Sequence, residues 1–263
     1  MASLTISIIQ TNLFWEDKTA NLEMLERKID SISQKTELVI LPEMFTTGFS
    51  MKPEAFGETM DGPTIEWMKD LAARKKIIIT GSLIIEENGA YFNRLIWMLP
   101  NGELGYYNKR HLFAFGDEHN HYTPGNKKLI ASVKGWKINL QVCYDLRFPV
   151  WARQTPGAEE NKYDLLINVA NWPEKRSTAW TTLLAARAIE NQCYVIGVNR
   201  VGNDGNDISY NGDSTIIDPL GEIIYQKNKD EDVFTYTLEK ENVIQTRAHF
   251  PFWKDADSFL ITD

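Results

Sequence analysis

The chain has 263 residues, of which 43% are apolar and 24% are charged, so it can bury a large core. Its 36 acidic and 28 basic side chains give a net charge of -8, and no long run of Lys and Arg occurs, which argues against a nucleic-acid-binding protein. We expect one α/β domain over residues 1–263.

Short apolar runs rich in β-branched residues predict nine strands. In chain order they cover residues 6–10, 38–41, 77–80, 95–99, 138–142, 165–170, 194–199, 214–217 and 233–238.

Helical patterns lie between several of these strands. In the first, Leu22, Leu25 and Ile29 share one face of an amphipathic helix. Pro63 is expected in the first turn of a second helix, and Ser177 is expected to cap a third over residues 178–191. Strands that alternate with helices predict a largely parallel core sheet.

Turn residues predict some antiparallel pairing as well. The sequences at 88–89, 100–102 and 219–221 combine Asn or Pro with Gly, which is typical of hairpins. We therefore expect mixed sheets.

The termini and the cysteines bear on localisation. No basic segment followed by an apolar one begins the chain, and no run of about 18 apolar residues occurs, so we expect neither export nor contact with a membrane. Cys143 and Cys193 are too few for a disulfide framework. These features favour a cytoplasmic protein.

Three polar side chains stand where chemistry is expected. Cys143 follows the strand at 138–142 and Glu43 follows the strand at 38–41, at the sheet edge where ligands of α/β proteins bind. Lys109 lies within an aromatic and apolar stretch. Taken singly, each has an ordinary explanation: a buried thiol, a solvent-facing carboxylate and a surface ammonium.

Together, a thiol, a carboxylate and an ammonium supply what amide cleavage requires: a nucleophile, a proton carrier and positive charge for an oxyanion. The order Glu43, Lys109, Cys143 resembles the nitrilase superfamily of carbon-nitrogen hydrolases. The resemblance covers nearly the whole chain, through the segments at 117–119, 169–173, 185–191, 197–202 and 212–214.

This resemblance implies a four-layer αββα sandwich, a homodimer formed through helical faces, and no cofactor. We expect Glu43 to take the proton of Cys143, while Lys109 and the backbone N–H of Tyr144 hold the oxyanion. The resemblance also implies that Glu118 is a second carboxylate that orients Lys109.

Within the superfamily, the segments at 107–113, 143–151 and 250–257 are similar to omega-amidases. This implies a small 2-oxo acid amide as the partner, such as 2-oxoglutaramate or 2-oxosuccinamate. Arg147, four residues beyond the nucleophile, could hold its carboxylate by two hydrogen bonds, or could form a structural ion pair instead. Trp172 could wall the pocket, or could be a packed aromatic without a ligand.

Three alternatives stay open. The same chemistry could act on an N-carbamoyl compound, a nitrile or an aliphatic amide, or the chain could be a catalytically idle scaffold. His119 and His121 could belong to a zinc hydrolase, although they lack the spacing of known zinc motifs. We expect no metal site.

Overall fold

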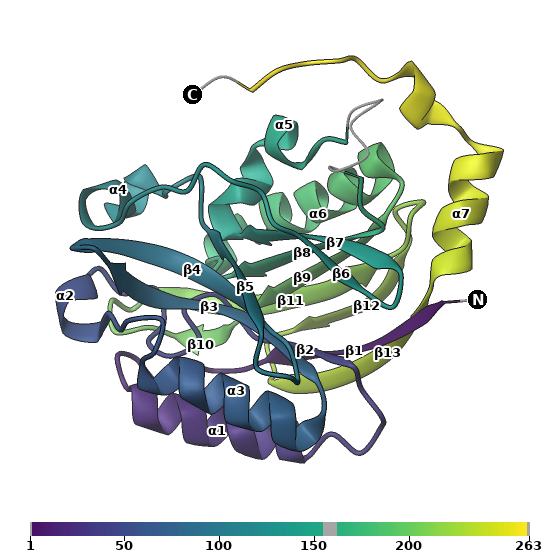
Figure 1. Ribbon diagram of the computed structural model, residues 1–263. Coiled ribbons are helices and arrows are strands. Elements are labelled where there is room, and N and C mark those ends of the chain that lie inside the picture. Colours follow the sequence, from purple (N-terminus) through teal and green to yellow (C-terminus); the bar gives the residue numbers. More distant parts are fainter. Residues whose placement is uncertain (1, 155–161, 262–263) are drawn as a thin grey trace.

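The computed structural model describes residues 2–154 and 162–261 and has four layers (Figure 1). Helices α1 (Lys18–Asp30) and α3 (Pro63–Lys75) cover the outer face of one sheet. Helices α5 (Pro149–Ala152) and α6 (Ser177–Asn191) lie on the other side of the stacked sheets. The predicted αββα sandwich is confirmed.

The first sheet has the strand order β13-β1-β2-β3-β4-β5. Strands β1, β2 and β3 are parallel, and the remaining pairs are antiparallel. The strands are β1 (Ser3–Gln10), β2 (Leu38–Ile40), β3 (Ile78–Glu87), β4 (Ala90–Met98), β5 (Leu104–Asn108) and β13 (Asp232–Glu239).

The second sheet has the order β10-β11-β9-β8-β7-β6, and β12 also pairs with β11. Strands β7, β8 and β9 are parallel and form its centre. The strands are β6 (Ile130–Val133), β7 (Trp136–Val142), β8 (Leu165–Ala170), β9 (Tyr194–Asn199), β10 (Val201–Asn203), β11 (Ser209–Ile217) and β12 (Ile223–Asn228). Both sheets are mixed, as the turn residues predicted.

Alternation along β1 explains how the layers pack. Ile6 and Ile8 point into the core between the sheets, where Leu140 of β7 also lies. Ile9 belongs to a second core, which lies between this sheet and its helices and includes Leu25 of α1. Because neighbouring residues of a strand face opposite sides, β1 supplies apolar groups to two layers at once.

The helix starts agree with the sequence in one case and differ in another. Pro63 occupies the first turn of α3, as expected. The prediction that Ser177 caps α6 is wrong, because Ser177 already has helical backbone angles (φ -59°, ψ -37°) and belongs to the helix. A 3-10 turn at Glu174–Arg176 leads directly into α6, so Arg176 stands in the capping position.

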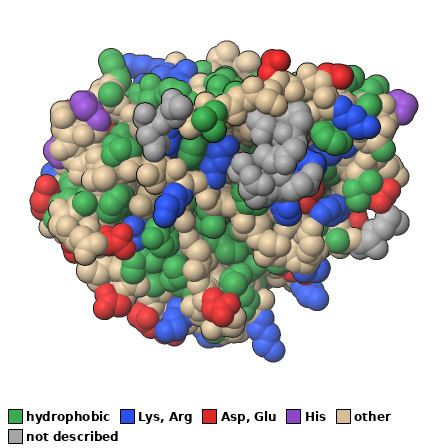
Figure 2. Space-filling view, turned by 45° about the horizontal axis from the view of Figure 1, so that its top comes forward, with side chains coloured by type: hydrophobic (Ala, Val, Ile, Leu, Met, Phe, Trp, Pro, Cys, Tyr) green, Lys and Arg blue, Asp and Glu red, His purple; other side chains and the backbone are tan. Residues whose placement is uncertain are grey.

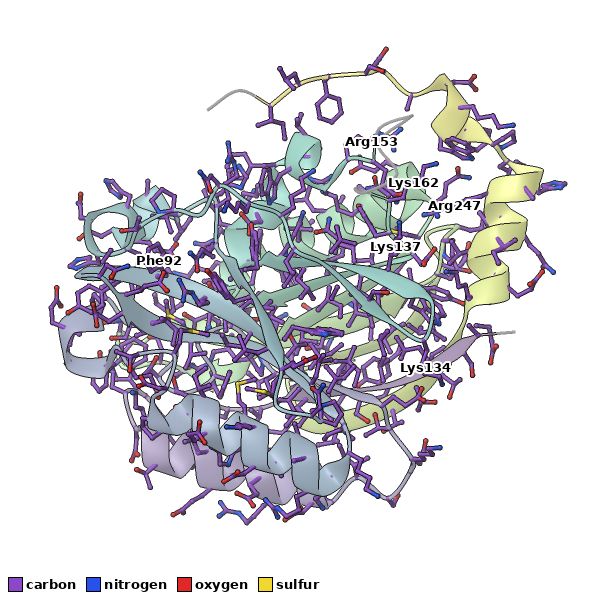
Figure 3. All side chains as sticks on the ribbon, in the orientation of Figure 1. Phe92, Lys134, Lys137, Arg153, Lys162 and Arg247 are labelled. Atoms are coloured by element: carbon purple, nitrogen blue, oxygen red, sulfur yellow. The ribbon has the colours of Figure 1, made fainter. Side chains whose placement is uncertain are left out.

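Helix α7 (Lys240–His249) lies at one end of the sandwich (Figure 1). Arg247 reaches from α7 toward the body of the molecule (Figure 3) and donates hydrogen bonds to the carbonyls of Tyr163 and Gln192. These bonds fix α7 to the loops that precede β8 and β9.

The surface mixes charges of both signs. On the face shown in Figure 2, Lys and Arg side chains are scattered among acidic and apolar ones, with no continuous basic tract. Over residues 2–154 and 162–261, no helix combines the length and the apolar character needed to span a bilayer.

Candidate active site

Four side chains from separate segments meet at one edge of the stacked sheets. Glu43 follows β2, Cys143 follows β7, Lys109 follows β5, and Glu118 opens the short helix α4 (Glu118–His121). All four are buried. The structure therefore brings together the four residues that the sequence analysis named as catalytic.

The Lys109 ammonium lies between two carboxylates. Its Nζ donates to Oε1 of Glu43 at 2.9 Å and to Oε1 and Oε2 of Glu118 at 3.0 and 2.9 Å. None of the three side chains is exposed to solvent. Two hydrogen-bonded partners thus compensate the cost of burying this ammonium.

Two asparagines hold Glu43 in place. Its Oε1 accepts from Nδ2 of Asn93 at 2.8 Å, and its Oε2 accepts from the backbone N–H of Asn171 at 2.7 Å. Asn171 also donates through Nδ2 to the carbonyl of Glu43 at 2.6 Å. Glu43 is thereby fixed against the end of β8, next to the thiol.

Burial and charge set the proton affinities of this cluster. Burial disfavours the ammonium, but the carboxylates of Glu118 and Glu43 outweigh it and raise the pKa of Lys109. Burial, only partly opposed by Lys109, raises the pKa of Glu118. Lys109 is therefore cationic throughout the neutral range, which is what stabilisation of an oxyanion requires.

Cys143 stands at a strained turn with its thiol protonated. Its backbone lies in the left-handed region (φ 45°), which is uncommon for residues other than glycine. Sγ lies 3.9 Å from the carbonyl of Asn171, and the residue is 9% exposed. Burial, the charge of Glu43 and a hydrogen bond to Glu43 raise the pKa of the thiol well above its usual value. Thiolate formation therefore needs a base, and Glu43 is the carboxylate in contact.

The buried carboxylate of Asp145 anchors the turn that carries Cys143. Its Oδ2 accepts from the N–H of Val142 at 3.0 Å and from the hydroxyl of Tyr107 at 2.7 Å. Its Oδ1 accepts from the N–H of His111 at 3.0 Å. The turn is thus tied both to its own strand and to the segment that supplies Lys109.

We expect Asp145→Asn to lower the free energy of unfolding by about 2 kcal/mol, because an amide nitrogen would face a buried donor. A displaced thiol should also reduce kcat by about 10-fold or more. Urea unfolding and steady-state kinetics measure both effects, with Asp218→Asn at a distant turn as the control. Equal stability of the two variants would contradict this role.

A pocket of about 200 Å³ opens in front of Cys143. The predicted substrate-binding residues Tyr144, Arg147 and Trp172 all line it, together with Phe113. The Arg147 guanidinium stacks over the ring of Trp172 at 4.8 Å. Within the described part of the chain, no carboxylate pairs with Arg147, so the alternative of a structural ion pair finds no partner there.

Trp172 fits both interpretations that the sequence left open. It lines the pocket, and it also packs against Trp180 with ring centroids 5.4 Å apart. Its backbone N–H donates to Oδ1 of Asn199 at 2.8 Å, which fixes the ring at the end of β8. A rigid aromatic wall beside Arg147 results.

Of the histidines of α4, His119 is exposed and His121 is half-buried. Nε2 of His121 lies 3.2 Å from the exposed Asp117 carboxylate, whereas Glu118 turns inward to Lys109. In residues 2–154 and 162–261, no group of three or more His, Cys, Asp or Glu side chains is arranged to hold a metal ion.

Sequence reasoning missed three residues that hold the catalytic side chains and their turns in place. Asn171 occupies the same strand-end position as Cys143, and this was a usable signal. Asn93 lies inside β4, and Asp145 follows the nucleophile without any marking pattern. Their roles depend on contacts between strands far apart in the sequence.

Comparison with known proteins agrees with this geometry. The family model described as carbon-nitrogen hydrolase matches residues 5–248. The chain is 43% identical to omega-amidase YafV of Escherichia coli strain K12, over 99% of this chain and 100% of that protein. It is 30% identical to 2-oxoglutaramate amidase of Bacillus subtilis, over 95% and 96% of the two chains.

A solved structure is also similar throughout its length. The structure of XC1258 from Xanthomonas campestris, a CN-hydrolase superfamily protein with an arsenic adduct in its active site, has a TM-score of 0.97 and 45% identity. The match covers 100% of both chains. The resemblance seen in the sequence, including that to omega-amidases, is confirmed.

Proposed function

The chain belongs to the carbon-nitrogen hydrolase family, and within it we propose an omega-amidase that converts 2-oxo dicarboxylic acid monoamides to 2-oxo acids and ammonia. The observation that carries this proposal is the meeting of the Cys143 thiol with Glu43 and Lys109 beside a pocket that contains the Arg147 guanidinium. 2-Oxoglutaramate and 2-oxosuccinamate are the proposed substrates.

The reaction begins with transfer of the Cys143 proton to Glu43 as sulfur attacks the amide carbon. The carbonyl oxygen becomes an oxyanion, which the Lys109 ammonium and the backbone N–H of Tyr144 stabilise. The C–N bond then breaks, and the leaving nitrogen takes the proton from Glu43 to depart as ammonia. A thioester on Cys143 remains.

Hydrolysis of the thioester repeats these roles with water as the nucleophile. Glu43 takes a proton from water, the hydroxyl oxygen attacks the thioester carbon, and the C–S bond breaks. The proton returns to sulfur and the acid leaves. Glu118 stays bound to Lys109 throughout and keeps the ammonium aimed at the oxyanion.

Arg147 is the proposed partner for the substrate's carboxylate, because its guanidinium faces the pocket and stacks on Trp172. We expect Arg147→Gln to raise KM for 2-oxoglutaramate by about 10- to 100-fold and to change kcat little. A factor of that size corresponds to the free energy of one lost charge-assisted hydrogen bond. Butyramide, which has no carboxylate, is the control substrate. An equal loss with butyramide would contradict the assignment.

A panel of amides tests the proposed function. Ammonia release is measured with 2-oxoglutaramate, 2-oxosuccinamate, glutamine, an N-carbamoyl amino acid, an aliphatic amide and a nitrile. The proposal predicts fast turnover of the first two and much slower turnover of the others, in both cases unchanged by a metal chelator. Turnover restricted to the others would replace the substrate class, chelator-sensitive turnover would favour a zinc hydrolase, and no turnover would favour the scaffold.

We also propose a cytoplasmic homodimer joined through helical faces. Exposed apolar side chains support this, since Val150 of α5 and Ile189 of α6 are 51% and 56% exposed. Both cysteines are unpaired, which fits a reducing compartment. We expect light scattering to give twice the monomer mass and Ile189→Glu to reduce it. A monomer at micromolar concentration would contradict this proposal.

A further inference from the structure

The pocket contains a second guanidinium, that of Arg176. We infer that Arg176 binds the 2-oxo acid end of the substrate together with Arg147 and thereby discriminates against α-amino acids such as glutamine. This inference rests on the proposed function and assigns its substrate specificity to a residue that sequence reasoning did not single out.

Arg176 contacts two other residues that line the pocket. It ends the 3-10 turn between β8 and α6, where its carbonyl accepts a hydrogen bond from Nε1 of Trp172 at 2.8 Å. Its guanidinium lies 5.0 Å from the ring centre of Phe113, which also lines the pocket. Each of the two arginines thus lies over an aromatic ring of the pocket, Arg147 over Trp172 and Arg176 over Phe113.

The charge balance of the pocket is positive. For neither Arg147 nor Arg176 does the structure record an ion pair with a carboxylate of residues 2–154 or 162–261. The carboxylate of the lining residue Asp204 is already occupied, by the N–H groups of Asn206 and Ile208 and by the hydroxyl of Tyr210. The pocket thus offers two cations and no unoccupied carboxylate.

This balance suits a 2-oxo acid and opposes an amino acid. A 2-oxo acid presents a carboxylate next to a carbonyl, which are acceptors that two planar guanidinium groups can share. Glutamine differs by an ammonium in place of the carbonyl. That ammonium would lie beside two guanidiniums, and the lining carboxylate of Asp204 already accepts three hydrogen bonds, so the site selects by repulsion as well as by attraction.

The test is a comparison of Arg176→Gln with Lys175→Gln, an exposed neighbour in the same turn that does not line the pocket. We expect Arg176→Gln to raise KM for 2-oxoglutaramate about 10-fold or more, with kcat within about threefold. The ratio of kcat/KM for 2-oxoglutaramate to that for glutamine should fall about 10-fold or more. Lys175→Gln should resemble the wild type, and Arg176→Lys should recover part of the lost affinity because it keeps the charge.

Other outcomes separate the possible errors. If Arg176→Gln lowers kcat equally for 2-oxoglutaramate and for butyramide, Arg176 only supports Phe113 and the inference is wrong. If KM and the glutamine ratio do not change while the wild type hydrolyses 2-oxoglutaramate, the inference fails and the omega-amidase proposal stands. If the wild type hydrolyses only butyramide, the proposed function itself fails, and the inference with it.

Discussion

Replacing Cys143 by alanine is expected to reduce kcat for 2-oxoglutaramate by about 10⁴-fold or more, because no other group in the pocket can form the thioester. Folding should be little affected, since one sulfur atom is removed at the pocket surface. Ammonia release and circular dichroism measure the two effects.

Cys193 provides the matched control for this variant. It is fully buried, and burial raises the pKa of its thiol to about 12, so it is also protonated at neutral pH. It is not a pocket-lining residue, and Cys193→Ala should keep kcat within about threefold while losing some stability to the cavity that it leaves. If Cys143→Ala retained activity and Cys193→Ala did not, the assignment of the nucleophile would be wrong.

The second large effect is expected from Glu43→Gln, which keeps the size of the side chain and removes the base. General-base catalysis contributes about 10²- to 10⁴-fold, and we expect kcat to fall by that factor. The carboxylate of Glu43 accepts hydrogen bonds from Lys109, Asn93 and Asn171, and the NH₂ group of the new amide would face these donors instead of accepting from them. Some loss of stability should follow.

The pH dependence of thiol alkylation distinguishes loss of the base from misfolding. Because burial raises the pKa of Cys143, its thiolate is scarce at neutral pH unless Glu43 accepts the proton. In Glu43→Gln the proton of Cys143 has no Glu43 carboxylate to accept it, but the negative charge of Glu43 that raises the pKa of the thiol is also lost while Lys109 remains. Alkylation by iodoacetamide should therefore persist at about pH 7 and rise with pH, while kcat stays low at every pH. Loss of alkylation at every pH would indicate a displaced thiol and would contradict a role for Glu43 as base.

Much of the fold could be predicted because its central strands carry a strong local signal. Leu165 to Ala170 is an apolar run interrupted only by Asn168, as expected for a parallel strand covered on both faces, and Ile138 to Val142 alternates apolar residues with Asn139 and Gln141. The strands β5, β6, β10 and β12 were missed because they are edge strands with polar residues or glycine in place of a long apolar run, and β10 has only three residues. Their pairing depends on neighbours distant in the sequence.

The candidate site also contains residues that the sequence predicts and residues that it does not. Glu43 and Cys143 were predictable because each follows an apolar strand. The carboxyl ends of parallel strands lie at one edge of a sheet, where ligands bind. Arg176 carried no signal, since a basic residue before a helix is ordinarily a surface residue. Only the pocket shows that its guanidinium faces the substrate region.

The most direct test of the central claim is to capture the thioester. The wild type is mixed with 2-oxoglutaramate, quenched in acid within milliseconds to seconds, and examined by intact and peptide mass spectrometry. We predict an added mass equal to the 2-oxoglutaryl group, located on the peptide that contains Cys143 and removed by hydroxylamine. Ammonia release without any adduct on Cys143, and undiminished in Cys143→Ala, would contradict the account.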